Sequence, residues 1–315
     1  MEKLKIIFMG TPEFAVTILE SILKNNYDVV AVITAPDKPA GRGQLLKYSA
    51  VKEFAIANEL TVLQPTNLKD ETFLTQLKAF GANLQVIVAF RMLPEAVWNM
   101  PKFGTINLHA SLLPNYRGAA PINWVIINGE IKTGVTTFFI DDKIDTGAMI
   151  LNAEISISDT ENAGELHDKL MVLGSKTVLE TLSLIEDNNI KTTFQEENPD
   201  TKTAYKLNKD NCKIDFSKSG QEIYNQIRGL SPYPAAWCNI KDDKNDWNVK
   251  IYETNFEKEE HDFNVGKIVF TKKEFKIAVK NGFLIVESMQ FPGKKRMKTT
   301  EILNGTKFSE NIIAY

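Results

Sequence analysis

Strand-like apolar runs alternate with helical segments along the first part of the chain. The apolar runs lie at residues 4–9, 27–34, 60–63, 84–89 and 105–109, and the helical patterns lie at 14–23, 49–58, 70–80, 121–128 and 162–184. Strands that alternate with helices fold into a parallel sheet with helices on both faces. Residues 1–188 are therefore predicted to form an α/β domain around a doubly wound, mostly parallel, Rossmann-like sheet.

The last third of the chain has a different pattern. Residues 189–206 are polar and without apolar periodicity, so we interpret them as a linker. After a helical segment at 219–230, short alternating runs follow at 236–240, 249–253, 267–270, 275–279 and 283–289. Short strands at such spacing predict a small C-terminal β-barrel within residues 207–315.

Composition excludes several classes of protein. With 37 Lys and Arg against 40 Asp and Glu, the chain is not a nucleic-acid binder as a whole, so an RNA site must be a local patch. Cys212 and Cys238 lie far apart and in no metal-ligand spacing, so we expect free thiols and no metal. The sequence has neither a signal-peptide pattern nor a run of roughly 20 apolar residues. We expect a cytoplasmic protein without a membrane segment.

The segment Thr105-Ile-Asn-Leu-His109 is the strongest candidate for a site. Its period of two would point Asn107 and His109 to one face of a strand, next to a loop rich in Pro and Gly. An amide and an imidazole so placed suit a site where an acyl oxygen becomes an oxyanion. A buried, purely structural pair would have the same pattern. The turn Gly10-Thr-Pro-Glu-Phe14 lacks two glycines of GxGxxG, so dinucleotide binding is not expected.

Five motifs in a fixed order resemble the formyltransferase family that uses 10-formyltetrahydrofolate. They are Asn107-Leu-His109, Ser111-Leu-Leu-Pro114, Arg117-Gly-Ala-Ala-Pro121, Thr133-Gly-Val-Thr136 and Asp145-Thr-Gly147. Further matching stretches at 8–15, 36–43, 228–237 and 293–297 extend the resemblance over nearly the whole chain. It implies an OB-like C-terminal barrel and a catalytic trio of Asn107, His109 and Asp145.

The resemblance also implies the reaction. A formyl group would move from 10-formyltetrahydrofolate, as co-substrate, to the α-amine of methionine esterified to initiator tRNA. The Asn107 amide and protonated His109 would bind the tetrahedral oxyanion. Asp145 would keep His109 charged and help accept the amine proton. Initiator methionyl-tRNA and folate are the expected partners, and no metal or obligate protein partner is expected.

Folate contacts are expected in three places. The residues that the resemblance assigns to them are Ser111, Leu112, Leu113, Pro114, Phe90, Arg91, Met92, Leu93, Ile140 and Asp141. At 90–93 the sequence departs from the commoner family pattern, which has a Tyr-Gly pair and one more residue. From composition alone, Asp141 and Asp142 are turn residues.

Two basic segments are candidates for tRNA contacts. The Pro- and Gly-rich loop 35–47 carries Lys38, Arg42 and Lys47, and could be a flexible connection or a segment that orders on a polyanion. The resemblance implies insertion into the acceptor stem, with Arg42 as the main contact. The second segment is a basic run in the barrel that includes Lys294, Lys295 and Arg296, with the acidic residues expected on preceding loops. Such a run is usually a solvated face, but on a barrel it could bind phosphates.

Three other functions remain open from sequence. A sister enzyme could formylate a sugar nucleotide or glycinamide ribonucleotide with the same trio, but would lack the Arg42 loop and this barrel. A hydrolase that releases formate would use the same oxyanion chemistry. A non-enzymatic RNA-binding protein could keep the scaffold, although an intact trio argues against it.

Overall fold

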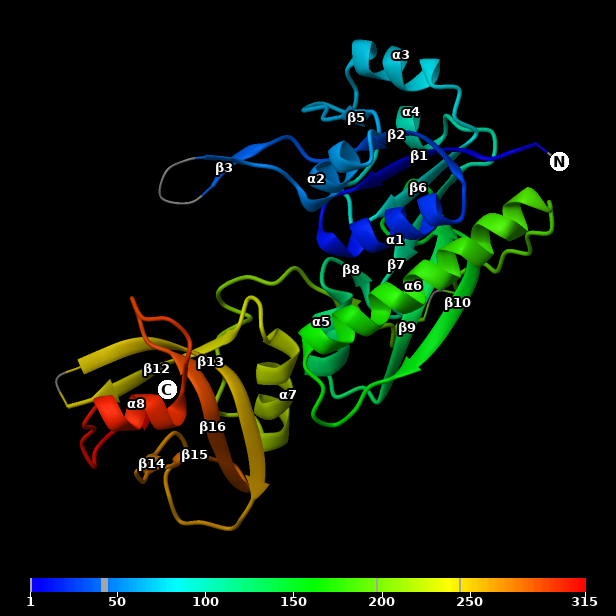
Figure 1. Cartoon of the computed structure of the whole chain (residues 1–315). Coiled ribbons are helices and arrows are strands. Elements are labelled where there is room, and N and C mark those ends of the chain that lie inside the picture. The colour runs from blue at the N-terminus through cyan, green and yellow to red at the C-terminus, as the bar shows by residue number, and fades with distance from the viewer. Residues whose placement is uncertain (1, 41–44, 197, 244) are drawn as a thin grey trace. The chain divides into compact units, whose positions relative to one another are not determined.

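The computed structural model describes residues 2–40, 45–196, 198–243 and 245–315 (Figure 1). The chain divides into two compact units. The first contains Met1–Gly118, Thr133–Ile155 and His167–Thr203, and the second contains Ala119–Lys132, Ser156–Leu166 and Ala204–Tyr315. The chain therefore passes between the units more than once.

The first unit contains a mostly parallel sheet. Its strands, in spatial order, are β10 (Met149–Ser156), β9 (Lys132–Phe139), β7 (Thr105–His109), β6 (Leu84–Val88), β1 (Lys5–Gly10), β2 (Asp28–Ile33) and β5 (Val62–Leu63). The five strands from β7 to β5 are parallel, and β9 is antiparallel to β7. The sheet is thus parallel over most of its width, as predicted.

Helices cover both faces of this sheet (Figure 1). The helices of this unit are α1 (Glu13–Lys24), α2 (Ala50–Ala57), α3 (Glu71–Ala79), α4 (Glu95–Trp98) and α6 (Ala163–Glu186). On one face, Phe73 of α3 and Val97 of α4 belong to one core cluster with Ile87 of β6. On the other, Gly174 of α6 lies beside Leu108 of β7. Asp70 caps α3 by accepting the Phe73 N–H at 3.0 Å, which fixes the predicted start of that helix. The doubly wound prediction is confirmed.

The predicted loop 35–47 contains a hairpin of β3 (Lys38–Ala40) and β4 (Leu45–Lys47) that projects from the sheet (Figure 1). Lys38 pairs with Lys47 across the hairpin, and both side chains are exposed. Arg42 lies outside the described residues. At the root of the hairpin, Lys52 of α2 donates to Asp37 at 2.5 Å and lies 3.9 Å above the Tyr48 ring. These contacts join residues on either side of the hairpin to α2. The base of the hairpin is therefore held in place, although composition indicated only a loop.

The second unit is built around a curved antiparallel sheet. Its strands are β12 (Ala236–Asp242), β13 (Asn245–Lys258), β14 (Ile268–Phe270), β15 (Phe275–Val279), β16 (Gly282–Gln290), β17 (Met297–Lys298) and β18 (Ile313–Ala314). The spatial order is β14, β15, β16, β13, β12, β18, and Lys267 bridges to Ile313. This bridge brings the two ends of the sheet together, so the predicted OB-like barrel is nearly closed.

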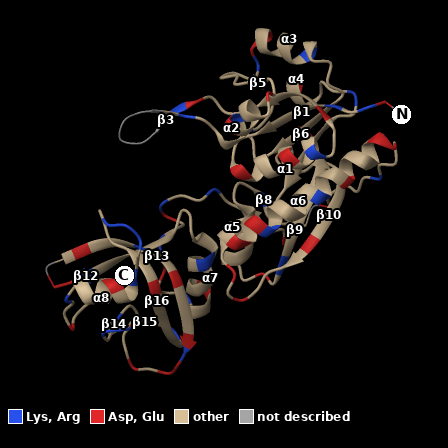
Figure 2. Ribbon diagram, in the orientation of Figure 1, with Lys and Arg blue, Asp and Glu red and all other residues tan. Residues whose placement is uncertain are grey.

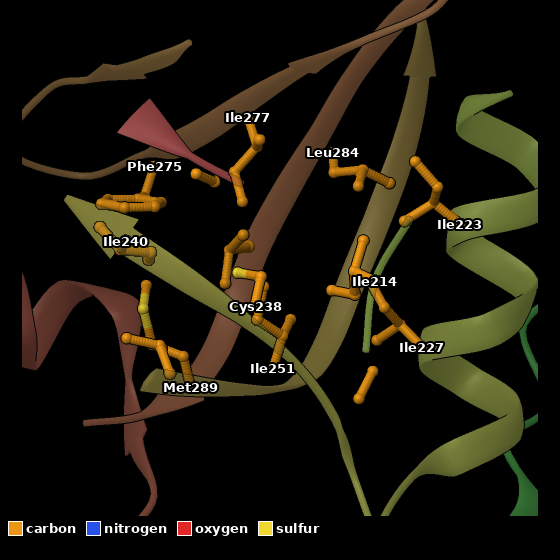
Figure 3. Packing of buried hydrophobic residues seen from close by; sticks show 14 of the residues in the cluster. Ile214, Ile223, Ile227, Cys238, Ile240, Ile251, Phe275, Ile277, Leu284 and Met289 are labelled. Atoms are coloured by element: carbon orange, nitrogen blue, oxygen red, sulfur yellow. The ribbon is translucent and has the colours of Figure 1, made fainter. Parts of the chain in front are cut away.

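Apolar side chains fill the interior of the barrel (Figure 3). The helices of this unit are α5 (Pro121–Ile127), α7 (Gly220–Leu230) and α8 (Thr299–Gly305), and the short strands β8 (Arg117–Gly118) and β11 (Thr203–Ala204) lie outside the two large sheets. Ile223 and Ile227 of α7 point toward Ile214 and Leu284 (Figure 3). The helix begins with a capping box, in which Ser219 and Glu222 satisfy each other's backbone N–H.

Candidate active site

The carboxyl ends of β1, β6 and β7 meet at one edge of the first sheet. The strand order reverses between β1 and β6, which is where open α/β sheets bind ligands. Gly10 ends β1, and a Cβ there would lie 2.6 Å from the Ala15 Cβ and 2.9 Å from the Val88 carbonyl oxygen. Close packing therefore accounts for this glycine, without a phosphate-binding role.

β7 places Asn107 and His109 on one face, as the alternation predicts. Asn107 pairs with Ile87 of β6, which belongs to the core under α3 and α4, whereas Leu108 points to the face of α6. Asn107 is half-buried. Within the described ranges, its side-chain amide has no hydrogen-bond partner. The amide can therefore donate to a ligand at this edge.

His109 is buried and held from two sides. Its Nε2 lies 2.8 Å from the Tyr116 carbonyl oxygen, and its Nδ1 lies 3.8 Å from Oδ2 of Asp145. A carbonyl oxygen can only accept, so Nε2 carries a proton and donates it to Tyr116. The Nδ1 edge then faces the carboxylate. The His109 and Asp145 side chains are 7% and 15% exposed, so water screens this pair only weakly.

Asp145 lies in the turn between β9 and β10. Its backbone has a φ of 55°, in the left-handed region. Its Oδ2 accepts the Gly118 N–H at 2.9 Å, which orients the carboxylate. A Cβ on Gly147 would lie 1.6 Å from the Phe139 carbonyl oxygen, so only glycine fits there. The turn thus fixes the position of Asp145 opposite His109.

Asp141 has a structural contact in the same turn. Its Oδ1 accepts the Lys143 N–H at 3.1 Å and the Thr146 hydroxyl at 2.8 Å. This is the pattern by which an aspartate stabilises a turn. Asp142 is exposed. Both observations agree with the turn role that composition indicated.

The loop after β7 is held by its own hydrogen bonds. The buried Ser111 hydroxyl donates to the Asn115 carbonyl at 2.6 Å, and the Thr136 hydroxyl donates to the Ser111 carbonyl at 2.7 Å. Leu113 is also buried, whereas Leu112 and Pro114 are half-buried. Within the predicted folate segment 111–114, Leu112 and Pro114 are thus the side chains that can reach a ligand.

The other predicted folate residues have different environments. Phe90 and Ile140 are partly buried against the core that contains Ile87, and Leu93 is buried inside that core. The Arg91 guanidinium lies over the Phe90 ring, 5.8 Å from its centre, and its Nη1 donates to the Thr66 carbonyl at 3.0 Å. Met92 is 69% exposed. Phe90 and Ile140 are therefore near the face of Asn107, but Leu93 contributes to packing.

Sequence reasoning missed Tyr116 and Gln195. Tyr116 acts through its backbone carbonyl, which no side-chain pattern reveals. Gln195 lies in the predicted linker, yet its Nε2 donates at 2.9 Å to the carbonyls of both Asp145 and Gly147. Its partners lie 50 and 48 residues away in sequence, so no local signal marks it.

In the barrel, the predicted placement of the acidic residues on loops is wrong for three of the six. Asp243, Glu259 and Glu260 lie outside the strands. Asp242 lies in β12, and Asp246 and Glu257 lie in β13, because both strands extend beyond the predicted apolar runs (Figure 2). Glu257 therefore reaches Lys276 of β15 at 2.9 Å. The basic run is partly neutralised within the barrel.

The three predicted tRNA contacts of the barrel have different surroundings. Arg296 forms an ion pair with Glu253 and donates to the Ser288 hydroxyl at 2.7 Å. Its guanidinium also lies 4.7 Å from the Tyr252 ring centre. Lys294 and Lys295 are exposed in the turn after β16. Arg296 is also exposed, but its guanidinium is already engaged by Glu253 and Ser288.

Both cysteines lie in the core of the second unit. Cys212 and Cys238 are free and buried, and burial raises the pKa of the Cys238 thiol to about 12. Within the described ranges, no three His, Cys, Asp or Glu side chains form a group that could hold a metal ion. None of the helices in these ranges is both long enough and apolar enough to cross a membrane.

Comparison with known proteins places this geometry in a family. The formyl transferase family model matches residues 3–182, and the formyl transferase C-terminal domain matches residues 206–307. Methionyl-tRNA formyltransferase of Flavobacterium johnsoniae is 69% identical over 100% of both chains. The enzyme of the same name from Bacteroides thetaiotaomicron is 50% identical over 98% of each chain.

Solved structures show the same fold at low identity. The sugar 3N-formyl transferase WlaRD, determined with dTDP and 5-N-formyl-THF, has a TM-score of 0.66 and 24% identity, with 94% of this chain and 100% of that chain covered. HypX from Aquifex aeolicus in complex with tetrahydrofolic acid has a TM-score of 0.65 and 14% identity, with coverage of 96% and 47%. The family models and the full-length relatives together show that the chain belongs to the formyl transferase family.

Proposed function

We propose that this chain transfers the formyl group of 10-formyltetrahydrofolate to the α-amine of methionyl-initiator tRNA. The product is N-formylmethionyl-tRNA, which serves translation initiation. The observation that carries the proposal is the position of Asn107, His109 and Asp145 at the carboxyl edge of the sheet. Full-length relatives of high identity bear the name methionyl-tRNA formyltransferase, which supports this choice of acceptor.

In the proposed mechanism, the amine attacks the formyl carbon and creates an oxyanion. The Asn107 amide donates a hydrogen bond to the oxyanion, and Nδ1 of His109, the ring nitrogen that is not bonded to Tyr116, faces Asp145. The Asp145 carboxylate, 3.8 Å from that nitrogen, can accept the amine proton, directly or through water. Collapse of the intermediate breaks the bond to N10 of the folate and returns that proton to the leaving nitrogen.

The proposed folate site lies at the same edge. Phe90 and Ile140 supply apolar surface, and the loop 111–114 borders the ligand through Leu112, Pro114 and its backbone. Internal hydrogen bonds hold that loop in shape, which lowers the entropy cost of binding. Chemistry is thus assigned to residues 1–188.

We place tRNA recognition on two surfaces. One is the hairpin with Lys38 and Lys47 in its two strands, together with Arg42, which lies between them in sequence. The other is the barrel at 207–315 with Lys294, Lys295 and Arg296. Residues 189–206 connect the two regions. A chain that acts on a charged tRNA and a reduced folate would work in the cytoplasm.

The test is an acceptor comparison. Purified protein with 10-formyltetrahydrofolate is given charged initiator tRNA, charged elongator tRNA, free methionine and an amino-sugar nucleotide, and formylated product is measured. Formylation of the charged initiator tRNA at a rate well above the other acceptors is expected. Preference for the sugar nucleotide, or release of formate without an acceptor, would refute the proposal.

A further inference from the structure

Residues 193–196 and 198–202 lie in the predicted linker, but they are attached to the candidate active site at both ends. We call these residues the strap. Thr193 and Met149 exchange backbone hydrogen bonds of 2.9 Å in both directions, so the strap begins against the strand that follows the Asp145 turn. The strap belongs to the first unit.

At its first end, the Gln195 side chain uses its full hydrogen-bonding capacity. Nε2 donates at 2.9 Å to the carbonyls of Asp145 and Gly147, while Oε1 accepts from Nε of Arg117 at 2.9 Å and from Nη2 at 2.6 Å. A primary amide has two N–H groups and two acceptor sites, and all four are in use. Gln195 therefore joins the Asp145 turn to Arg117, which precedes the Gly118 N–H that orients the Asp145 carboxylate.

At its other end, the strap holds the residue that contacts His109. The Tyr116 N–H donates to the Lys202 carbonyl at 2.6 Å, and the Lys202 N–H donates to Oδ1 of Asn115 at 3.1 Å. The Tyr116 carbonyl in turn accepts from His109. One short segment thus fixes the backbone around both members of the His109–Asp145 pair.

We propose that the strap positions His109 and Asp145 for catalysis, and that Gln195 is its main positioning residue. The inference rests on the proposed function, which makes that pair catalytic. Asp145 has a left-handed backbone that other contacts must hold in place, and Gln195 bonds to its carbonyl. A shift of about 1 Å in a catalytic group can lower a rate on the order of 10²-fold.

Two substitutions separate the donor and acceptor roles of Gln195. Gln195→Ala removes every bond, and Gln195→Glu keeps an acceptor for Arg117 but loses both N–H donors. We expect each to lower kcat roughly 10- to 100-fold, with KM for folate and for charged tRNA changed less than about threefold. The part of the pH profile of kcat that depends on the His109–Asp145 pair should also shift.

Asn83→Ala is the matched control. The Asn83 side chain likewise bridges backbone groups, accepting the Lys5 N–H at 2.8 Å and donating to the Lys3 carbonyl at 2.9 Å, but near the start of β1. It should lower the melting temperature and leave kcat and its pH profile unchanged. Equal losses of kcat in Asn83→Ala and Gln195→Ala, or full activity in Gln195→Glu, would overturn the proposal.

Hydrogen exchange distinguishes this result from failure of the proposed function. Peptides covering residues 116–118 and 145–147 should exchange faster in Gln195→Ala than in the parent. If the parent formylates none of the acceptors, the proposed function fails, and exchange still tests the strap. Unchanged exchange at both segments would refute the positioning role.

Discussion

Asp145→Asn isolates the charge of the carboxylate from its shape. Asparagine tolerates a φ of 55°, and its Oδ1 can still accept the Gly118 N–H, so the turn should survive. The substitution removes the negative charge 3.8 Å from His109 and the group that can accept the amine proton. The fold and the folate affinity should therefore change little, while turnover falls.

The size of the loss can be estimated from the geometry. Two unit charges 3.8 Å apart attract by about 4 kcal/mol at an effective dielectric constant of roughly 20. If the transition state carries the imidazolium, loss of that attraction lowers the rate about 10³-fold. Loss of a general base alone typically costs on the order of 10² to 10⁴. Both estimates predict a loss near 10³-fold.

The assay is single-turnover formylation of charged initiator tRNA with saturating 10-formyltetrahydrofolate, across pH, together with thermal unfolding. Asp142→Asn is the matched control, because Asp142 is an exposed residue of the same turn. It should keep the parental rate. A loss below about tenfold in Asp145→Asn, with a parental melting temperature, would show that the charge of Asp145 is not needed.

Four further outcomes are expected. Asn107→Ala should lower kcat on the order of 10²- to 10³-fold without weakening folate binding, and near-full turnover would remove Asn107 from the site. Neutralising Lys294 and Lys295 should make the slope of log tRNA affinity against log salt concentration shallower by about 0.9 per lost phosphate contact. An unchanged slope would mean that the two lysines are only part of a solvated surface. Cys238, with its pKa raised from 9.0 to about 12, should resist alkylation at pH 8 until the protein unfolds, and rapid labelling of native protein would contradict its burial. Hydrogen bonds from Lys52 and then Gln64 lower the pKa of Asp37 below 3.8, so Asp37 stabilises the fold above that pH and loses this effect as pH falls. The stability difference between parent and Asp37→Asn should therefore be present at pH 7 and shrink in acid, and a difference that is independent of pH would refute this.

Local signals were sufficient for most of the fold. Apolar runs and caps such as Asp70 predicted the parallel strands and their helices, because these patterns act within a few residues. The length of β13 was not predicted, because its last residues, 254–258, are mostly polar and are held as a strand by pairing with β16. Asn107 and His109 were predictable from alternation.

The rest of the candidate site was not accessible to the same reasoning. The Gln195 amide finds its partners 48 to 78 residues away, and composition around it resembles any polar connection. Tyr116 holds His109 through a backbone atom, so its identity carries no signal. The roles of such residues depend on contacts that form only in the folded chain, whereas strands and helices can be predicted from local sequence.

The second unit draws its parts from separated stretches of the chain. Gly229 of α7 packs against α5, and its carbonyl accepts from Asn123 at 2.8 Å. The buried Arg228 donates to the Glu161 carbonyl at 2.9 Å. A fragment that began at residue 207 would expose these surfaces and deprive the buried Arg228 of its carbonyl acceptors at Ser158 and Glu161, leaving only Asn225. The barrel is therefore not a module that could be exchanged intact between proteins by cutting at the linker, and during synthesis it cannot complete its folding from its own strands alone.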